Sequence, residues 1–257
     1  MFREYPLEGQ KGLVVGIANE SSVAWGAAQA YKERGAELAV TYLNDKAERH
    51  VRPLAERVEA PIIMPLDVTR PGQIEAVFDA IGETWGRLDF LLHSIAFAPM
   101  SDLHGRVTDC SLEGFQTAMD VSCHSFIRLA RAAEPLMKDG GCLTTMTYIG
   151  SQRVVPNYNM MGPVKAALES VVRYLAAELG PKRIRVNAVS PGPIQTRAAS
   201  GISEFDHLMK DVFQRAPVTK PVSIEEVGAA TAALASAAAA TITGSIVYVD
   251  SGFNIMA

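Results

Sequence analysis

The chain has 257 residues, 48% of them hydrophobic, and a formal net charge of −4. A chain of this length can bury a full core without disulfide or metal staples. The negative charge argues against general nucleic-acid binding, which needs a basic face to displace counterions.

Cysteine and histidine usage gives no sign of a disulfide framework or a metal site. Cys110, Cys123 and Cys142 lie far apart without a CxxC pair, and the five histidines lack metal-ligand spacing. A reducing cytoplasm is the setting that this favours. The first residues lack the apolar core of a signal peptide. The most apolar stretch, 229–249, is broken by Thr241 and Gly244, so we interpret it as a buried helix and a strand, not a membrane span.

Short β-rich runs alternate with helical patterns along the whole chain. Strands are expected at residues 12–17, 37–42, 61–66, 88–94, 142–147, 184–189 and 246–249. Helices are expected at residues 23–34, 45–58, 72–85, 112–137 (as a pair), 162–179 and 223–238. The strand runs are almost continuously apolar, which is typical of strands buried on both faces. The sequence therefore predicts an α/β fold: one Rossmann-type, doubly wound domain over residues 1–257, with a seven-stranded parallel sheet and helices on both faces.

In such a sheet the ligand binds beyond the carboxyl ends of the strands, where every motif of this chain falls. The first is the turn between Gly16 and Gly26. Small residues let the backbone approach a pyrophosphate, and the following helix supplies N–H groups and a positive dipole end. The alternative is an ordinary strand–helix turn in which Ser22 caps the helix.

The second and third strands end where an adenosine is usually recognised. Leu43 stands in place of the frequent acidic residue, and we favour NADH over NADPH because no arginine meets a 2′-phosphate at the strand end. Lys46 and Arg49 are near, but solvation of a helix face is the favoured interpretation for both. Asp67 could accept a hydrogen bond from the adenine amine or cap the next helix, and the sequence leaves both open.

Two further loops follow the fourth and sixth strands. After the fourth, the small residues Ala96 and Ala98 leave room for cofactor and substrate. His93 is interpreted as structural, because no neighbour in sequence orients it as a base. After the sixth, the Pro191–Thr196 turn has backbone groups that could meet a nicotinamide carboxamide, and Thr196 could donate to pyrophosphate. A proline-stiffened loop is the plainer alternative.

Residues 197–215 carry apolar side chains at helical spacing. That pattern normally indicates a core-facing helix. Because the segment follows the loop assigned to the cofactor, a substrate-binding lid is an equal alternative. The apolar positions are Ile202, Phe205, Leu208, Met209 and Phe213.

Two tyrosines and a lysine form the most informative group. A phenol can donate a hydrogen bond to a carbonyl oxygen that gains negative charge, and a lysine can hold a hydroxylated cofactor near it. Tyr158 and Lys165 are separated by six residues, so they share a helix face about 10 Å apart along an ideal helix. Both can reach one cofactor if Tyr158 lies in a looser turn before the helix. Pro163 agrees with that, since proline suits a helix's first turn.

These residues together resemble the short-chain dehydrogenase/reductase superfamily and, more closely, its divergent enoyl-(acyl-carrier-protein) reductase branch. The similarity runs from Gly16 to Phe253, and its most specific part is Tyr148, nine residues, Tyr158, six residues, Lys165. Other superfamily members have tyrosine and lysine separated by three residues. Pro163 and, to a lesser degree, Leu43 depart from the family pattern.

The resemblance implies reduction of trans-2-enoyl thioesters of acyl carrier protein with NADH, in bacterial type II fatty-acid synthesis, by a homotetramer. Tyr158 would bond the thioester oxygen, Lys165 the nicotinamide ribose, and Tyr148 would assist. The family's dinucleotide contacts correspond to Gly16, Ser22, Val23, Leu43, Asp67, Val68, Ile95, Lys165, Ile194 and Thr196. Its acyl-chain contacts correspond to Ala98, Tyr148, Tyr158, Met161, Ile202 and Phe205.

Two other functions remain open. A ketone or alcohol oxidoreductase of the same superfamily would need a hydroxyl on the fifth strand, which Thr145 could supply, but the short tyrosine–lysine spacing is absent. A non-catalytic dinucleotide-binding regulator would be expected to lose a tyrosine or the lysine. Arg197, Lys210, Arg215 and Lys220 could receive an acidic carrier protein, although scattered surface charge is the simpler and favoured interpretation.

Overall fold

The structure, a computed structural model, describes residues 6–196, 209, 212 and 214–256. Within these residues, seven strands form one parallel sheet in the order β3-β2-β1-β4-β5-β6-β7. The strands are β1 (Lys11–Val15), β2 (Glu37–Tyr42), β3 (Ile62–Pro65), β4 (Phe90–His93), β5 (Gly141–Met146), β6 (Ile184–Pro191) and β7 (Ile246–Val249). This confirms the predicted sheet. The strand order reverses between β1 and β4, which creates the switch point where open α/β sheets bind ligands.

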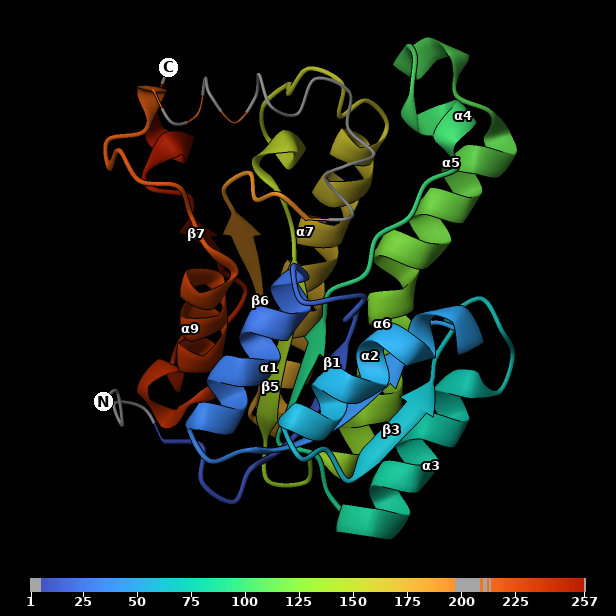
Figure 1. Ribbon diagram of the computed structural model, residues 1–257, viewed down its shortest axis with the longest axis vertical. Coiled ribbons are helices and arrows are strands. Elements are labelled where there is room, and N and C mark those ends of the chain that lie inside the picture. Colours follow the sequence, from blue (N-terminus) through green and yellow to red (C-terminus); the bar gives the residue numbers. More distant parts are fainter. Residues whose placement is uncertain (1–5, 197–208, 210–211, 213, 257) are drawn as a thin grey trace.

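Helices cover both faces of the sheet. They are α1 (Val23–Glu33), α2 (Asp45–Arg57), α3 (Gln73–Trp85), α4 (Met100–Leu103), α5 (Leu112–Met119), α6 (Ser125–Ala133), α7 (Met161–Leu179) and α9 (Ile224–Ala235). Helices α1, α2 and α9 pack on one face, and α3, α6 and α7 pack on the other (Figure 1). In the described part of the chain, no helix is both long and apolar enough to cross a bilayer.

Two apolar clusters, one on each face, explain why the strands are so uniformly hydrophobic. On β1, Leu13 belongs to one cluster and its neighbour Val14 to the other. Leu91 and Leu92 divide in the same way on β4. Because successive side chains of a strand point to opposite faces, a sheet covered on both sides needs apolar residues at every position.

The two helices predicted within residues 112–137 are joined in a way that their hydrophobic pattern does not reveal. Helices α5 and α6 are joined by a π-helical turn, Asp120–His124. In this region the Ser122 hydroxyl bonds the Phe97 backbone, and the Ser125 hydroxyl donates to Val121 O at 2.6 Å. The wider turn thus gives two buried serines partners outside the regular helical ladder.

Helices α1 and α9 cross in direct backbone contact. A Cβ on Gly26 would lie 2.1 Å from Ile224 O, and a Cβ on Gly228 would lie 2.2 Å from Gly26 O. Because the two backbones are in contact, neither helix can shift without displacing the other. The crossing also fixes α1, whose first turn adjoins the loop after β1.

We expect Gly228→Ala to destabilise the fold by about 1–3 kcal/mol, because the new methyl group overlaps the α1 backbone. Gly82→Ala is the matched control, since Gly82 lies inside α3 and its Cβ would be 3.7 Å from Leu136 Cδ2. There the helix propensity of alanine should stabilise by up to about 1 kcal/mol. Urea unfolding measures both. Equal effects of the two variants would contradict the close crossing.

Candidate active site

The parallel register brings the predicted segments together at the carboxyl edge of the sheet. The turn after β1 begins at Gly16, where φ is +116° and a Cβ would lie 2.1 Å from Ser94 O. Glycine is therefore required for β1 and β4 to approach each other at the switch point. Ser22 Oγ accepts from Ala18 N and Asn19 N, both at 3.0 Å, and makes no capping bond to α1. Its side chain thus shapes the turn, not the helix end.

The adenosine side of the site contains an exposed apolar residue and an acidic turn. Leu43, at the end of β2, is 55% exposed. Asp67 Oδ1 accepts from Thr69 N at 2.9 Å and from Thr69 Oγ1 at 2.6 Å. Helix α3 begins at Gln73 with Gly72 at its N-cap, so the alternative that Asp67 caps this helix is wrong. Val68 beside it is buried.

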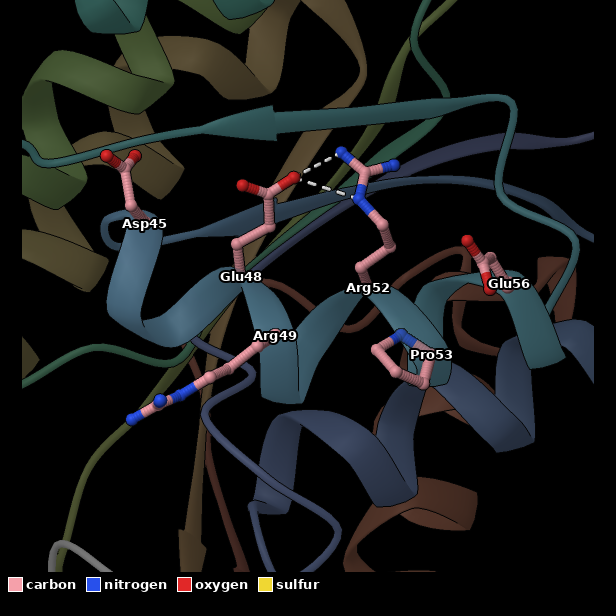
Figure 2. Close-up of a pocket in the computed structure, with 6 residues that line it drawn as sticks. All are labelled: Asp45, Glu48, Arg49, Arg52, Pro53 and Glu56. Atoms are coloured by element: carbon pink, nitrogen blue, oxygen red, sulfur yellow. Dashed lines mark hydrogen bonds and ion pairs between the residues drawn. The ribbon is translucent and has the colours of Figure 1, made fainter.

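The cations near Leu43 lie on a solvated helix face. Lys46 and Arg49 are exposed, and Arg49 extends away from the Glu48–Arg52 pair (Figure 2). In that pair, Glu48 Oε1 accepts two hydrogen bonds from the Arg52 guanidinium. The pocket in this figure is lined by residues of α2 with mixed charges, and none of them is a predicted site residue.

His93 is fully buried and has two partners that sequence distance concealed. Its Nδ1 lies 2.7 Å from Thr145 Oγ1, and its Nε2 lies 2.9 Å from Ser125 Oγ. Because Ser125 donates to Val121 O, its oxygen accepts from His93 Nε2–H, and Nδ1 then accepts from Thr145. Burial, and next to it the charge of Lys165, lowers the pKa of His93 to about 3. His93 is therefore a neutral structural residue, as predicted, but it is firmly oriented.

The loop after β4 is held by the π-helical turn. Ser122 Oγ accepts from Phe97 N at 2.9 Å and donates to Phe97 O at 3.1 Å. Ile95 is half-buried and Ala98 is buried on either side of this anchor. No sequence motif could have identified Ser122 as the anchor of this loop.

Tyr158 precedes the regular helix, as the spacing requires. Helix α7 begins at Met161, which places Pro163 in its first turn. The flanking residues Asn157 and Asn159 have φ of +64° and +45°, so the chain leaves the helical region around Tyr158. Asparagine tolerates this left-handed conformation better than most residues. The predicted looser turn is thus confirmed.

The two tyrosine rings are in contact beside a glycine. Their centroids are 4.9 Å apart at 65°, an edge-on arrangement. A Cβ on Gly150 would lie 2.4 Å from Tyr158 Cδ1 and 3.3 Å from Tyr148 Cδ1. Gly162 approaches the same segment, since its Cβ would lie 2.9 Å from Gly150 O. No sequence motif marked either glycine as part of the site.

Burial shifts the pKa values of Tyr148, Tyr158 and Lys165. It raises the pKa of Tyr148 to about 12 and that of Tyr158 further, with added contributions from Tyr148 and Glu169 at Tyr158. It lowers the pKa of Lys165 to about 8, and Lys165 Nζ donates to Met146 O at 2.8 Å at the end of β5. The buried Tyr148 hydroxyl has no hydrogen-bond partner among the described residues. A buried hydroxyl of this kind is suited to a ligand.

The remaining predicted residues are only partly described. Met161 and Ala98 pack with Tyr158 in a small apolar cluster. Val23, Ile194 and Thr196 are half-buried. Ile202 and Phe205, like Arg197 and Lys210, lie outside the described residues. Met209 and Val212 line a cavity together with Gly192 and Pro193, so the described part of the 197–215 segment adjoins the loop after β6.

A strand-order reversal between β1 and β4, together with the buried Tyr158 and Lys165, defines a class of protein, the Rossmann-type dinucleotide-dependent oxidoreductases. The family model described as enoyl-(acyl carrier protein) reductase matches residues 16–254. The chain belongs to this family.

Individual relatives cover almost the whole chain. The enoyl-(acyl-carrier-protein) reductase (NADH) FabI of Rickettsia felis is 48% identical over 250 residues, 97% of this chain and 96% of its own. A solved reductase of Anaplasma phagocytophilum in complex with NAD is 43% identical, covers 97% of this chain and 95% of its own, and has a TM-score of 0.93. The Bacillus cereus reductase, solved with NADP+ and an indole naphthyridinone, is 41% identical with a TM-score of 0.96, over 98% and 99% of the two chains.

The buried lysine should make stability depend on pH. The pKa of Lys165 lies below its ordinary 10.5, so between about pH 8 and 10.5 the unfolded chain binds more protons than the folded one. Stability therefore rises with pH through this window. Lys165→Met, which removes the buried charge, should be more stable than the wild type at pH 7 by at most about 3 kcal/mol.

Urea unfolding at pH 7 and at pH 10 measures this difference, which should shrink at the higher pH. Lys138→Met, at an exposed lysine, is the control. If the free energies of unfolding of wild type and Lys165→Met differ by the same amount at both pH values, burial of the charged lysine is not the cause of the difference.

Proposed function

We propose that the protein reduces the carbon–carbon double bond of trans-2-enoyl thioesters on acyl carrier protein with NADH, in bacterial type II fatty-acid synthesis. The observation that carries the proposal is the contact between Tyr148 and Tyr158 ahead of the helix that bears Lys165. Family membership over residues 16–254 supports the same reaction.

The residues at the carboxyl edge fit a dinucleotide. Gly16 lets the chain ends of β1 and β4 approach each other closely, and Ser22 fixes the turn that leads to the N-terminus of α1, whose N–H groups suit pyrophosphate. Leu43 offers no charge to a 2′-phosphate, which favours NADH over NADPH. The remaining contacts that we assign to the dinucleotide are Val23, Asp67, Val68, Ile95, Lys165, Ile194 and Thr196.

The phenols stabilise charge on the substrate. When bound, NADH supplies the hydride that reaches the β-carbon of the enoyl group. Tyr158 donates a hydrogen bond to the thioester oxygen as negative charge develops there, and its raised pKa keeps it protonated at neutral pH. Tyr148, with its unpartnered hydroxyl, assists at the same oxygen. Lys165 holds the ribose hydroxyls.

The acyl chain binds against the small apolar cluster around Tyr158. We assign Ala98, Tyr148, Tyr158 and Met161 to this pocket, with Ile202 and Phe205 of the 197–215 segment, the proposed lid of the single catalytic domain. The cavity lined by Met209 and Val212 supports a lid at this position.

The alternative functions are less well supported. In a ketone or alcohol oxidoreductase, the hydroxyl of Thr145 would face the substrate, but it is fully buried and bonded to His93. A non-catalytic regulator would not need the buried lysine and both buried phenols, each of which costs desolvation energy.

The assembly and setting follow from the family and from surface residues. We propose a homotetramer, supported by the exposed apolar residues Tyr174 of α7 and Leu112 of α5. The three free cysteines support a cytoplasmic setting.

Two of the cations considered for docking acyl carrier protein already contact other side chains. Lys220 forms an ion pair with Glu226, and the Arg215 guanidinium lies 5.5 Å from the Phe253 ring centre.

The reaction is tested with purified protein, a crotonyl thioester and NADH, whose absorbance should fall. Tyr158→Phe should lower kcat by roughly 10²–10³, because one donor to the developing oxyanion is lost. Its circular dichroism should remain that of the wild type. Turnover of ketones alone, or an unaltered kcat in Tyr158→Phe, would be inconsistent with the proposal.

Lys165→Ala should weaken NADH binding, because the ammonium that bonds the ribose is removed. Isothermal titration calorimetry with NADH measures the effect on the dissociation constant, with Lys138→Ala as an exposed control. If Lys165→Ala binds NADH as tightly as the wild type, the lysine does not hold the cofactor.

A further inference from the structure

Glu169 is a buried carboxylate on α7, one turn beyond Lys165, and it accepts hydrogen bonds from the connection between β5 and α7. Thr147 Oγ1 and Ser151 Oγ donate to its Oε1 at 2.7 and 2.5 Å, and Gln152 Nε2 donates to its Oε2 at 3.3 Å. Only 3% of Glu169 is exposed. The carboxylate therefore joins one helix to three side chains of a single loop.

Burial makes these bonds strong and makes their loss costly. A buried carboxylate is tolerated when hydrogen bonds replace its hydration, and bonds to a charged acceptor are shorter and stronger than neutral ones. The three donors are the hydrogen-bond partners of Glu169 among the described residues, and Lys165, one turn earlier, interacts with it electrostatically. The first part of this connection, residues 147–152, is consequently fixed to α7 at both of its ends.

The bonded side chains bracket Tyr148 in the sequence. Thr147 precedes this tyrosine, and Ser151 and Gln152 form the end of the 3-10 turn (Ile149–Ser151) that follows it. Gly150, within the bracketed segment, contacts the Tyr158 ring. The placement of both phenols relative to α7 thus depends on where Glu169 holds residues 147–152.

We propose that Glu169 is a positioning residue for enoyl reduction, whose carboxylate anchors residues 147–152 to α7 and so holds Tyr148 against Tyr158. The inference rests on the proposed function for the roles of these tyrosines. An acidic residue in the middle of a helix is usually a solvated surface group, so the anchoring role belongs to this buried geometry and not to the residue type.

The first test compares Glu169→Ala with Glu169→Gln. The glutamine retains an acceptor oxygen for Thr147 and Ser151, and it should keep kcat within about threefold of wild type. The alanine releases the loop and should lower kcat by roughly 10- to 100-fold, since displacement of a reacting group by about 1 Å costs that much. Glu178→Ala, an exposed acid on the same helix, is the control and should be silent. Equal losses in the glutamine and alanine variants would overturn hydrogen-bonded anchoring.

A double-mutant cycle with Tyr148→Phe separates positioning from a general structural effect. If Glu169 acts through Tyr148, the Glu169→Ala/Tyr148→Phe double variant should have the kcat of the worse single variant. If the fold-losses in kcat of the two single variants instead multiply in the double variant, the proposal is overturned, because Glu169→Ala would then act independently of Tyr148, as a general destabilisation of the fold would. If Glu169→Ala does not fold, Thr147→Val takes its place in the cycle, as it removes one donor without changing the side-chain volume.

Amide hydrogen exchange distinguishes failure of the anchor from failure of the proposed reaction. Glu169→Ala should exchange faster than wild type over residues 147–152, and Glu169→Gln should not. Thr147→Val, which also loses one of the donors, should accelerate the same segment. Unchanged exchange in the variants would refute the anchor whatever the enzyme reduces. If the wild-type protein does not reduce crotonyl thioester with NADH, the proposed reaction is refuted. The exchange data still show in that case whether Glu169 anchors residues 147–152.

Discussion

The packing of Tyr158 against Tyr148 and Gly150 is the contact on which the site depends. In a continuous helix Tyr158 would stand about 10 Å along the axis from Lys165. The chain instead enters α7 only at Met161, and the left-handed backbone on either side of Tyr158 lets its ring pack against Tyr148, two residues after the end of β5. Any side chain at position 150 would occupy that space.

Three ionisable groups are buried around this contact, and each is accommodated differently. Lys165 has a lowered pKa and bonds a strand-end carbonyl. His93 stays neutral between two hydroxyls. Glu169 is surrounded by three donors. The sheet, covered on both faces by apolar helices, provides a low-dielectric frame in which such polar groups must be fully satisfied, so their geometry is held tightly.

Much of the fold could be predicted because its determinants are local. Buried parallel strands need apolar residues at every position, so the seven runs were recognisable, and their predicted ends differ from the structure by at most two residues. The spacing between Tyr158 and Lys165 predicted the loose turn, since an ideal helix could not bring both to one ligand. The π-helical turn between α5 and α6 was missed because it depends on the Phe97 backbone, 25 residues from Ser122.

The sequence by itself determined the α/β class, the order of the elements, the motifs at the strand ends and the tyrosine–lysine spacing, all of which are encoded in periodicity and short-range chemistry. Tertiary structure alone decided that Thr145 and Ser125 orient His93 and that Glu169 holds the Tyr148 loop. Those outcomes depend on which side chains meet across strands and helices that lie far apart along the chain, and residue order does not specify such meetings until the core has packed.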